Sequence, residues 1–233
     1  MTKTKNKVAI FDIDGTIFRS SLLIELVNEM IDENLFPKEI RKEYEQEYFL
    51  WLDRRGKYDD YINAVVRAYN ERIKGVDYAD FKKVAERVIE RMKNRVYRYT
   101  RDLVQELKSK GYFLLAISHS PMEIVQDFGY NTGFDKVYGR IYEIGEDKKF
   151  TGGMEFVDLI ADKAKVLERA MEKEGLTLAG SIGVGDTEGD ITLLKMVENP
   201  ICFNPNQNLY NEAKKNNWPI VVERKDVIYE LNR

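Results

Sequence analysis

The spacing of apolar residues changes along the chain and divides it into regions of different predicted structure. The run VAIFDI, from Val8 to Ile13, has the length and composition of a buried strand in a parallel sheet. From about Ser20 to Lys110, apolar residues return every three or four positions, as they do on one face of an α-helix. Three such stripes are present: Leu22, Leu23, Leu26, Val27, Met30 and Ile31; Ile62, Val65, Val66, Tyr69 and Ile73; and Phe81, Val84, Val88 and Met92.

After Gly111 the pattern alternates between short apolar runs and helical stretches. Such alternation predicts a mainly parallel sheet with helices on both faces. The segment from Lys136 to Gly153, rich in strand-forming residues around a Gly-Glu-Asp-Lys turn, predicts a hairpin. The predicted fold class is therefore α/β, a doubly wound parallel sheet interrupted by an all-helical insert. The further predicted strands are residues 112–117, 181–184, 201–203 and 219–222.

The chain of 233 residues is longer than most compact domains, which usually have about 100–150 residues. The change from helical to alternating pattern places the division near the first strand and near residue 100. We predict a core domain formed by residues 1–18 and 100–233, and a helical insert formed by residues 19–99.

Composition excludes several kinds of chemistry, because the chain contains one histidine, His119, and one cysteine, Cys202. Zinc sites need more such ligands, and one cysteine cannot form an intrachain disulfide. A catalytic Ser-His-Asp arrangement would depend on His119 alone. General acid and base chemistry is therefore expected from carboxylates, lysine or tyrosine. Cys202 lies in an apolar run, which favours a buried side chain over a nucleophile.

The net charge of −3 argues against a chain built as a whole for nucleic acid or anionic membranes. Two basic clusters, Arg54–Lys57 and Lys93–Arg101, lie on predicted amphipathic helices with acids nearby, which is typical of solvated faces. No apolar run approaches the roughly 18 residues of a membrane span, and acids interrupt the first one, which fits a signal peptide poorly. We expect a cytoplasmic protein without a membrane partner, for which nucleic acid is an unfavoured ligand.

Polar residues follow the predicted strands at the edge where ligands of open α/β sheets bind. Two carboxylates held close together repel, and a divalent cation relieves that repulsion. Each motif alone equally fits a turn or a helix cap. Lys163 could neutralise a phosphate oxygen, but spacing alone does not separate it from Lys165. The residues at the strand ends are Asp12, Asp14, Ser118, His119, Asp186 and Asp190.

In order, these motifs are an apolar strand with DxDGT, a strand ending in serine, a lysine, and GDxxxD. Together they resemble the haloacid dehalogenase superfamily of phosphate-transferring hydrolases, and the resemblance covers almost the whole chain. The insert resembles the type 1 helical cap of the phosphoserine phosphatase-like branch, which Thr151–Gly153 (TGG) also fits. The resemblance implies a Rossmann-like core with a helical cap, and a Mg²⁺-dependent phosphatase acting on a small phosphorylated metabolite.

The resemblance also implies a role for each residue. Asp12 would be the nucleophile that forms an aspartyl-phosphate, and Asp14 the general acid and base. Lys163, rather than Lys165, matches the family's KxxxL pattern through Leu167. The implied phosphate ligands are Ser118, Lys163 and the backbone N–H groups of Ile13 and His119. The implied Mg²⁺ ligands are Asp12, the backbone carbonyl of Asp14, Asp186, and Asp190 directly or through water.

Some positions depart from the pattern of phosphoserine phosphatases. These enzymes commonly have DST where Asp14-Gly15-Thr16 stands, glutamate in place of Ser21, and two glycines in place of His119-Ser120. The carboxylate expected to bind a substrate amine is then missing unless Glu25 or Glu29 serves. Phosphoserine is possible but not favoured. Candidate specificity residues facing the site are Arg19, Glu25, Trp51, Arg54 and Arg55.

Three other functions remain open from sequence alone. The chain could be a phosphoserine phosphatase proper. It could also be a non-catalytic phosphoacceptor, although an acid/base at Asp14 would hasten loss of the phosphoryl group. Processing of nucleic-acid ends rests only on the basic helices. The oligomeric state is not encoded in any motif.

Overall fold

The computed structural model describes residues 6–231, which contain one mixed sheet of eight strands in the order β4-β3-β2-β1-β5-β6-β7-β8. Five of the seven strand pairs are parallel, and only the outer pairs β3–β4 and β7–β8 are antiparallel. The predicted α/β class is confirmed. The strands are β1 (Asn6–Phe11), β2 (Phe113–Pro121), β3 (Lys136–Ile144), β4 (Phe150–Glu155), β5 (Leu176–Gly185), β6 (Asn199–Phe203), β7 (Ile220–Arg224) and β8 (Val227–Leu231).

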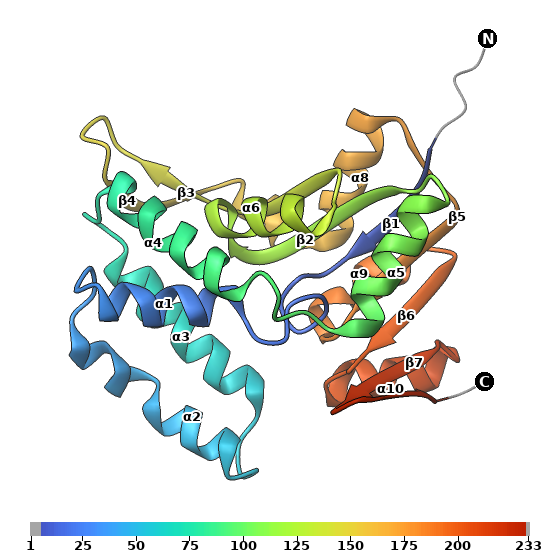
Figure 1. Cartoon of the computed structure of the whole chain (residues 1–233), viewed down its shortest axis with the longest axis horizontal. Helices are drawn as coiled ribbons and strands as arrows, with labels where there is room; N and C mark the ends of the chain where they lie inside the picture. The colour runs from blue at the N-terminus through green and yellow to red at the C-terminus, as the bar shows by residue number, and fades with distance from the viewer. Residues whose placement is uncertain (1–5, 232–233) are drawn as a thin grey trace.

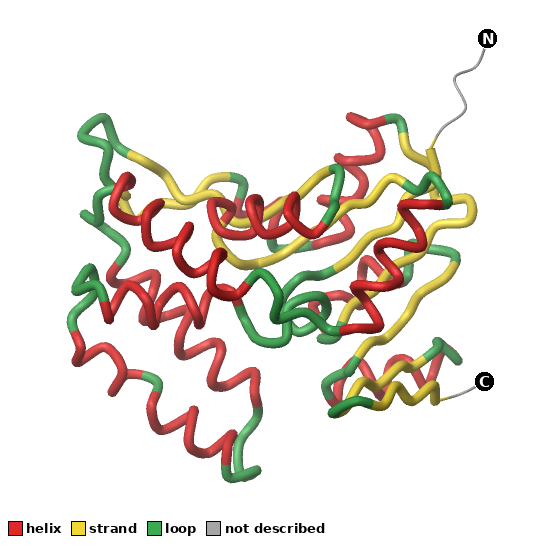
Figure 2. The backbone as a smooth tube through the Cα atoms, in the orientation of Figure 1, coloured by secondary structure: helices red, strands yellow, loops and turns green. Residues whose placement is uncertain are grey.

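The central strands are buried on both faces, which explains their unbroken apolar sequence. In β1, Ala9 and Phe11 face one apolar cluster, whereas Val8 and Ile10 face another. The first cluster includes side chains of α5 (Arg98–Ser109) and α6 (Met122–Thr132), and the second those of α8 (Lys163–Glu174) and α9 (Ile191–Leu194). Helices therefore cover both faces, as the doubly wound prediction requires (Figure 2).

Six helical segments come between β1 and β2, and the first five of them gather on one side of the sheet, away from β7 (Figure 1). The three predicted apolar stripes lie on α1, α3 and α4, and their buried residues join the cluster on the β1 and β2 face. The segments are α1 (Leu22–Asp32), η1 (Lys38–Glu43), α2 (Glu45–Leu52), α3 (Tyr58–Arg72) and α4 (Tyr78–Met92); the others in the described chain are α7 (Val157–Ile160), η2 (Glu188–Asp190) and α10 (Gln207–Asn216).

The predicted hairpin is present as β3 and β4, and it holds the helical segments to the sheet. The turn before α4 exchanges backbone hydrogen bonds with β4: Gly75 N–H donates to Phe150 O over 2.7 Å, and Phe150 N–H to Val76 O over 3.0 Å. The buried Phe150 ring contacts the rings of Phe81 and Tyr78 at centroid distances of 4.9 and 5.9 Å. One end of the helical insert is thus fixed to the hairpin.

Strand ends differ from the predicted ones where they form the site. β1 ends at Phe11, because the next residues form a turn in which the N–H groups of residues 16–18 all donate to the Ile13 carbonyl. β2 continues past Ile117 to Pro121, which pairs with Arg140 of β3. β8 was not predicted from sequence. Within residues 6–231, no helix is both long and apolar enough to cross a membrane.

Candidate active site

The predicted site residues meet at one edge of the sheet. Asp12 follows β1, Ser118 lies near the end of β2, and Asp186 follows β5. Because β1 pairs in parallel with both β2 and β5, the carboxyl ends of the three strands coincide. Lys163, the first residue of α8, reaches the same edge. The fold therefore brings together residues that lie up to 174 positions apart.

A buried ion-pair network forms the floor of the site. The Lys163 Nζ lies 2.5 Å from Asp12 Oδ1 and 2.5 Å from Asp190 Oδ1. The three side chains are at most 7% exposed. A cation buried this deeply needs charged partners at close range, and both aspartates supply them. This contact selects Lys163 over Lys165, a choice that spacing alone left open.

Asp186 completes a cluster of three carboxylates. One oxygen each of Asp12, Asp186 and Asp190 lie within 4.8 Å of one another. Thr16 Oγ1 donates to Asp186 Oδ1 over 3.2 Å. Gly15 has φ +82°, and a Cβ there would lie 2.0 Å from Asp186 Oδ2. A side chain at position 15 would fill the space that the carboxylate uses, which gives the glycine of the DxDG motif a physical reason.

The buried cluster contains three carboxyl groups and one ammonium group. Burial raises the pKa of Asp12 to about 7, although Lys163 acts in the opposite direction. Burial, then Asp12 and Asp190, raise the pKa of Asp186 well above its usual range. Burial lowers the pKa of Lys163, but its two aspartates outweigh that effect and raise it overall. Three carboxylates around one ammonium fit a further divalent cation, and carboxylate oxygens are the ligands that Mg²⁺ prefers.

Asp190 has both oxygens engaged by protein groups. Its Oδ1 contacts Lys163, and its Oδ2 accepts from the backbone N–H groups of Asp186 and Thr187 over 3.0 and 3.1 Å. A Cβ at Gly185 would lie 2.4 Å from Asp190 Cβ, so the side chain packs against the strand end. This arrangement orients both Lys163 and the loop that carries Asp186.

Asp14 points toward β2 and the start of α1. Its Oδ2 accepts from Ser118 Oγ over 2.7 Å and from Ser120 Oγ over 2.8 Å, and its Oδ1 accepts from Leu22 N–H over 2.6 Å. Ser120 was noted from sequence only as a departure from the family pattern. The signal for its role is the Ser-x-Ser spacing, because residues two apart in a strand lie on the same side.

The ring of His119 serves the structure around the site. Its Nε2–H donates to the Ile160 carbonyl of α7 over 3.0 Å. Burial, together with the charges of Lys163 and Arg140, lowers the pKa of His119 to about 4. The imidazole is therefore neutral at pH 7 and ties β2 to the segment before Lys163. The roles of the His119 and Ile13 backbone N–H groups stay predictions.

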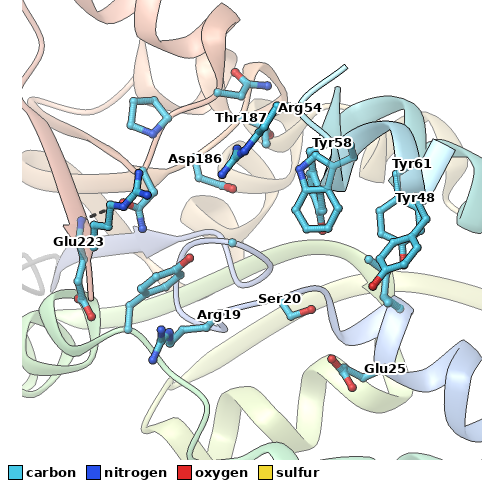
Figure 3. A pocket seen from close by; sticks show the side chains of 18 of the residues that line it. Arg19, Ser20, Glu25, Tyr48, Arg54, Tyr58, Tyr61, Asp186, Thr187 and Glu223 are labelled. Atoms are coloured by element: carbon cyan, nitrogen blue, oxygen red, sulfur yellow. Dashed lines mark hydrogen bonds between the residues drawn. The ribbon is translucent and has the colours of Figure 1, made fainter. Parts of the chain in front are cut away.

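A cleft of about 1070 Å³ opens beside the aspartate cluster (Figure 3). Gly15 and Asp186 line it on the sheet side, and α1, α2 and α3 line the opposite side. Of the predicted specificity residues, Arg19, Glu25, Trp51 and Arg54 line the cleft. Arg55 does not line it and lies 3.4 Å from Asp53. Glu29 is buried against Arg91, at 2.7 Å, and is not available to a ligand in the cleft.

Sequence reasoning missed the tyrosines of the cleft. Tyr48, Tyr58, Tyr61 and Tyr97 line it together with Trp51. The signal was present in the density of aromatic residues between positions 44 and 61. Those residues lie in the region that the sequence predicts as helical, and the structure shows that their rings also line the cleft.

Comparison with known proteins places these features in a family. The model of the haloacid dehalogenase-like hydrolase family matches residues 9–195. The inhibition of morphological differentiation protein of Streptomyces azureus is 26% identical over 220 residues, which cover 91% of this chain and 77% of that protein. The phosphoserine phosphatase of Methanocaldococcus jannaschii is 25% identical, over 96% of this chain and 95% of that one. A solved structure of unknown function from Bordetella pertussis superimposes with a TM-score of 0.74 at 15% identity, covering 93% of this chain and 98% of that one.

Proposed function

Because the chain belongs to the haloacid dehalogenase-like hydrolase family, we propose that it is a Mg²⁺-dependent phosphomonoesterase that works through an aspartyl-phosphate on Asp12. The family match and the relatives named as phosphatases confirm the predicted class of enzyme, a hydrolase of the phosphatase type. The metal, the intermediate and a small phosphorylated metabolite as substrate belong to the proposal.

The observation that carries the proposal is the position of Asp12 beside Asp186, at the sheet edge next to the cleft. Its carboxylate is held by Lys163 and lies beside Asp186, which lines the cleft. A nucleophile for phosphoryl transfer needs an in-line approach and dense positive charge around the transferred oxygens. Lys163 supplies one such charge at the reacting carboxylate. A non-catalytic phosphoacceptor is not favoured, because Asp14 follows Asp12 by two residues and has donors that hold it in place.

Mg²⁺ would be held by Asp12, Asp186 and the backbone carbonyl of Asp14. When bound, it would neutralise charge on the phosphoryl oxygens and keep Asp12 ionised. Asp190 would act mainly by orienting Lys163 and the Asp186 loop, because its oxygens already accept hydrogen bonds.

The protein residues divide the reaction into two steps. In the first, an Asp12 oxygen attacks phosphorus, the ester P–O bond breaks, and Asp14 gives a proton to the leaving alkoxide. In the second, Asp14 takes a proton from water, which attacks the phosphorus of the aspartyl-phosphate and releases inorganic phosphate and free Asp12. Ser118 would turn its proton from Asp14 to a phosphoryl oxygen, since one hydroxyl donates a single hydrogen bond.

We further propose that residues 19–99 act as a cap over this site. The cleft lies between these helices and the sheet edge, so the leaving group of a bound ester would contact them. Asp59 at the start of α3 accepts a hydrogen bond from Asn206 Nδ2 across the cleft, at 3.4 Å. Contacts of this kind let cap position respond to what the cleft contains.

Phosphate release from p-nitrophenyl phosphate tests the proposed function. We expect Mg²⁺-dependent release by the unaltered chain and none above background by Asp12→Asn, which keeps the side-chain size but cannot attack. Asp102→Asn, at an exposed position on α5, is the matched control and should keep full activity. Equal activity of Asp12→Asn and the unaltered chain would contradict the mechanism.

A further inference from the structure

A continuous aromatic surface forms one side of the cleft. It consists of Tyr48 and Trp51 of α2 and Tyr58 and Tyr61 of α3, here called the aromatic wall. The rings of Trp51 and Tyr61 stack at 5.8 Å and 15°, and Trp51 meets Tyr58 at 5.3 Å and 62°. Tyr48 lies 5.1 Å from Tyr61. Because each ring is fixed by another, the wall is a preformed surface.

The aromatic wall begins close to the reacting groups. Tyr58 lines the same cleft as Gly15 and Asp186, and Figure 3 shows its ring facing the space beside Asp186. Burial, and then the charges of Asp14 and Asp186, raise the pKa of the Tyr58 hydroxyl above its usual range. An ester with its phosphoryl group at Asp12 would therefore extend its alcohol half along the wall.

The charged side chains of the described chain that line the cleft are balanced, four arginines against four carboxylates, so they do not draw a cationic group to the wall. Within residues 6–231, the side chain of Arg54 forms no hydrogen bond or ion pair, and the residue lines the cleft just after α2, with φ +59°. Arg19 also faces the cleft, above the Tyr97 ring, whereas Glu25 faces it from α1. Recognition of a quaternary ammonium uses rings on several sides of the cation. Here the four rings of the aromatic wall lie next to the Arg54 guanidinium, and the further ring of Tyr97 already lies against the Arg19 guanidinium.

The size of the cleft favours an alcohol half larger than that of a three-carbon ester. Pockets of about 300–1,000 Å³ typically enclose drug-sized ligands. At about 1070 Å³, this cleft is slightly larger than that range. A three-carbon amino alcohol bound at Asp12 would leave most of the aromatic wall without contact.

We propose that the substrate is a phosphate monoester whose alcohol half carries a planar aromatic or heteroaromatic ring, and that this ring stacks on the aromatic wall. The inference rests on the proposed phosphatase function. Flat rings gain from face-to-face and edge-to-face contact beyond the area they bury. The neutral, preformed surface of Trp51, Tyr58 and Tyr61 offers that contact in the same cleft as Asp186.

Two matched pairs of esters test the proposal. Benzyl phosphate and cyclohexylmethyl phosphate have equal charge and similar size, but only the first has a planar ring. Adenosine 5′-monophosphate and ribose 5-phosphate test a nucleoside ring in the same way. We expect kcat/KM to favour the ring-bearing ester about fivefold or more in at least one pair, the ratio that corresponds to about 1 kcal/mol of stacking.

Trp51→Leu should bring that ratio close to one, and Trp51→Phe, which retains a ring, should restore much of it. Tyr130→Leu, which removes a half-exposed ring of α6 outside the cleft, is the control and should leave the ratio unchanged. Release of phosphate from all four esters without ring preference would overturn the inference, as would faster hydrolysis of phosphocholine. The absence of release from every ester would instead overturn the proposed function.

A binding measurement that needs no turnover separates stacking from chemistry. The chain has two tryptophans, so Trp218→Phe leaves Trp51 as the sole indole. Benzylphosphonate, which is not hydrolysed, should quench the Trp51 fluorescence of this variant in a saturable way, and cyclohexylmethylphosphonate should bind at least about fivefold more weakly. Equal binding of the two phosphonates would contradict ring stacking even in an inactive protein.

Discussion

At the scale of single residues, the site depends on groups that hold the reacting aspartates as much as on the aspartates themselves. Ser118 and Ser120 both donate to Asp14 Oδ2, over 2.7 and 2.8 Å. When Ser118 turns to a phosphoryl oxygen, Ser120 is the hydroxyl left to hold Asp14. The second serine thus allows the first one to serve the substrate.

Replacing Ser120 by alanine should impair the acid role of Asp14. We expect kcat for an alkyl phosphate to fall about tenfold, a part of what general acid catalysis contributes. For p-nitrophenyl phosphate the loss should be much smaller, because nitrophenolate leaves without a proton. Steady-state kinetics with both esters measure the difference. Ser109→Ala, on α5, should change neither rate, and equal losses for the two esters would indicate a purely structural role.

His119 should make the protein less stable in acid. Its pKa is about 4 in the fold and about 6.5 in an unfolded chain, so the unfolded state binds more protons between these values. Stability is therefore fully present above pH 6.5 and is lost as the pH falls toward 4. The variant His119→Gln can still donate a hydrogen bond to Ile160. Urea unfolding should show that its free energy of unfolding falls less on acidification than that of the unaltered chain, by a difference of the order of 3 kcal/mol. Parallel pH curves would show that His119 does not titrate in this way.

At the scale of elements, the helical insert is fixed to the hairpin at one end and borders the cleft at the other. Its attachment is the contact of residues 75–78 with β4, centred on Phe150, which is 1% exposed. Its other end, α2, carries exposed apolar side chains beside the cleft. The attachment to the hairpin therefore holds the insert, and with it the aromatic wall, in place beside the sheet edge.

Phe150→Ala should loosen this attachment. We expect a loss of about 3–5 kcal/mol in the free energy of unfolding, because the ring contacts Tyr78, Phe81 and Tyr142 in the core. Urea denaturation measures the loss. Phe49→Ala removes a ring that is 52% exposed and should cost less than about 1 kcal/mol. Similar losses for the two variants would contradict the role of Phe150 as the anchor.

Apolar periodicity predicted the elements better than their ends. Strand β1 and the stripes of α1, α3 and α4 were predictable because both depend on burial of residues close in sequence. The edge strand β8 was not, because its exposed side chains lack a buried face and its pairing with β7 is set by neighbouring backbone. The end of β1 was also missed, since the turn after it is made by hydrogen bonds to one carbonyl.

At the scale of the whole molecule, the site is predictable as a set of residues but not as a network. Ligands of open α/β sheets bind at the carboxyl ends of the strands, and this rule predicts from sequence alone that Asp12, Ser118 and Asp186 lie together. It does not show that Lys163 joins Asp12 to Asp190, that Ser120 holds Asp14, or that tyrosines line the cleft. Those contacts depend on the relative positions of separate elements, which local spacing does not encode.

Mg²⁺ should stabilise the folded chain as a whole. A cation bound to Asp12 and Asp186 would stabilise their ionised forms, which burial and the neighbouring carboxylates disfavour. At about a hundredfold excess over Kd, binding adds about 2.7 kcal/mol, which corresponds to a Tm rise of about 5 °C or more. Thermal unfolding with and without Mg²⁺ measures this. Asp186→Asn should abolish the shift and Asp53→Asn should retain it; an equal shift in both variants would place the ion elsewhere.

The most direct test of the account is to trap the phosphorylated enzyme. The chain is mixed with excess p-nitrophenyl phosphate and Mg²⁺, quenched in acid within the first turnovers, digested and examined by mass spectrometry. The account predicts one added phosphoryl group on the peptide that contains Asp12, and none in Asp12→Asn. Phosphate release without any phosphorylated peptide, or a phosphoryl group on another residue, would contradict it.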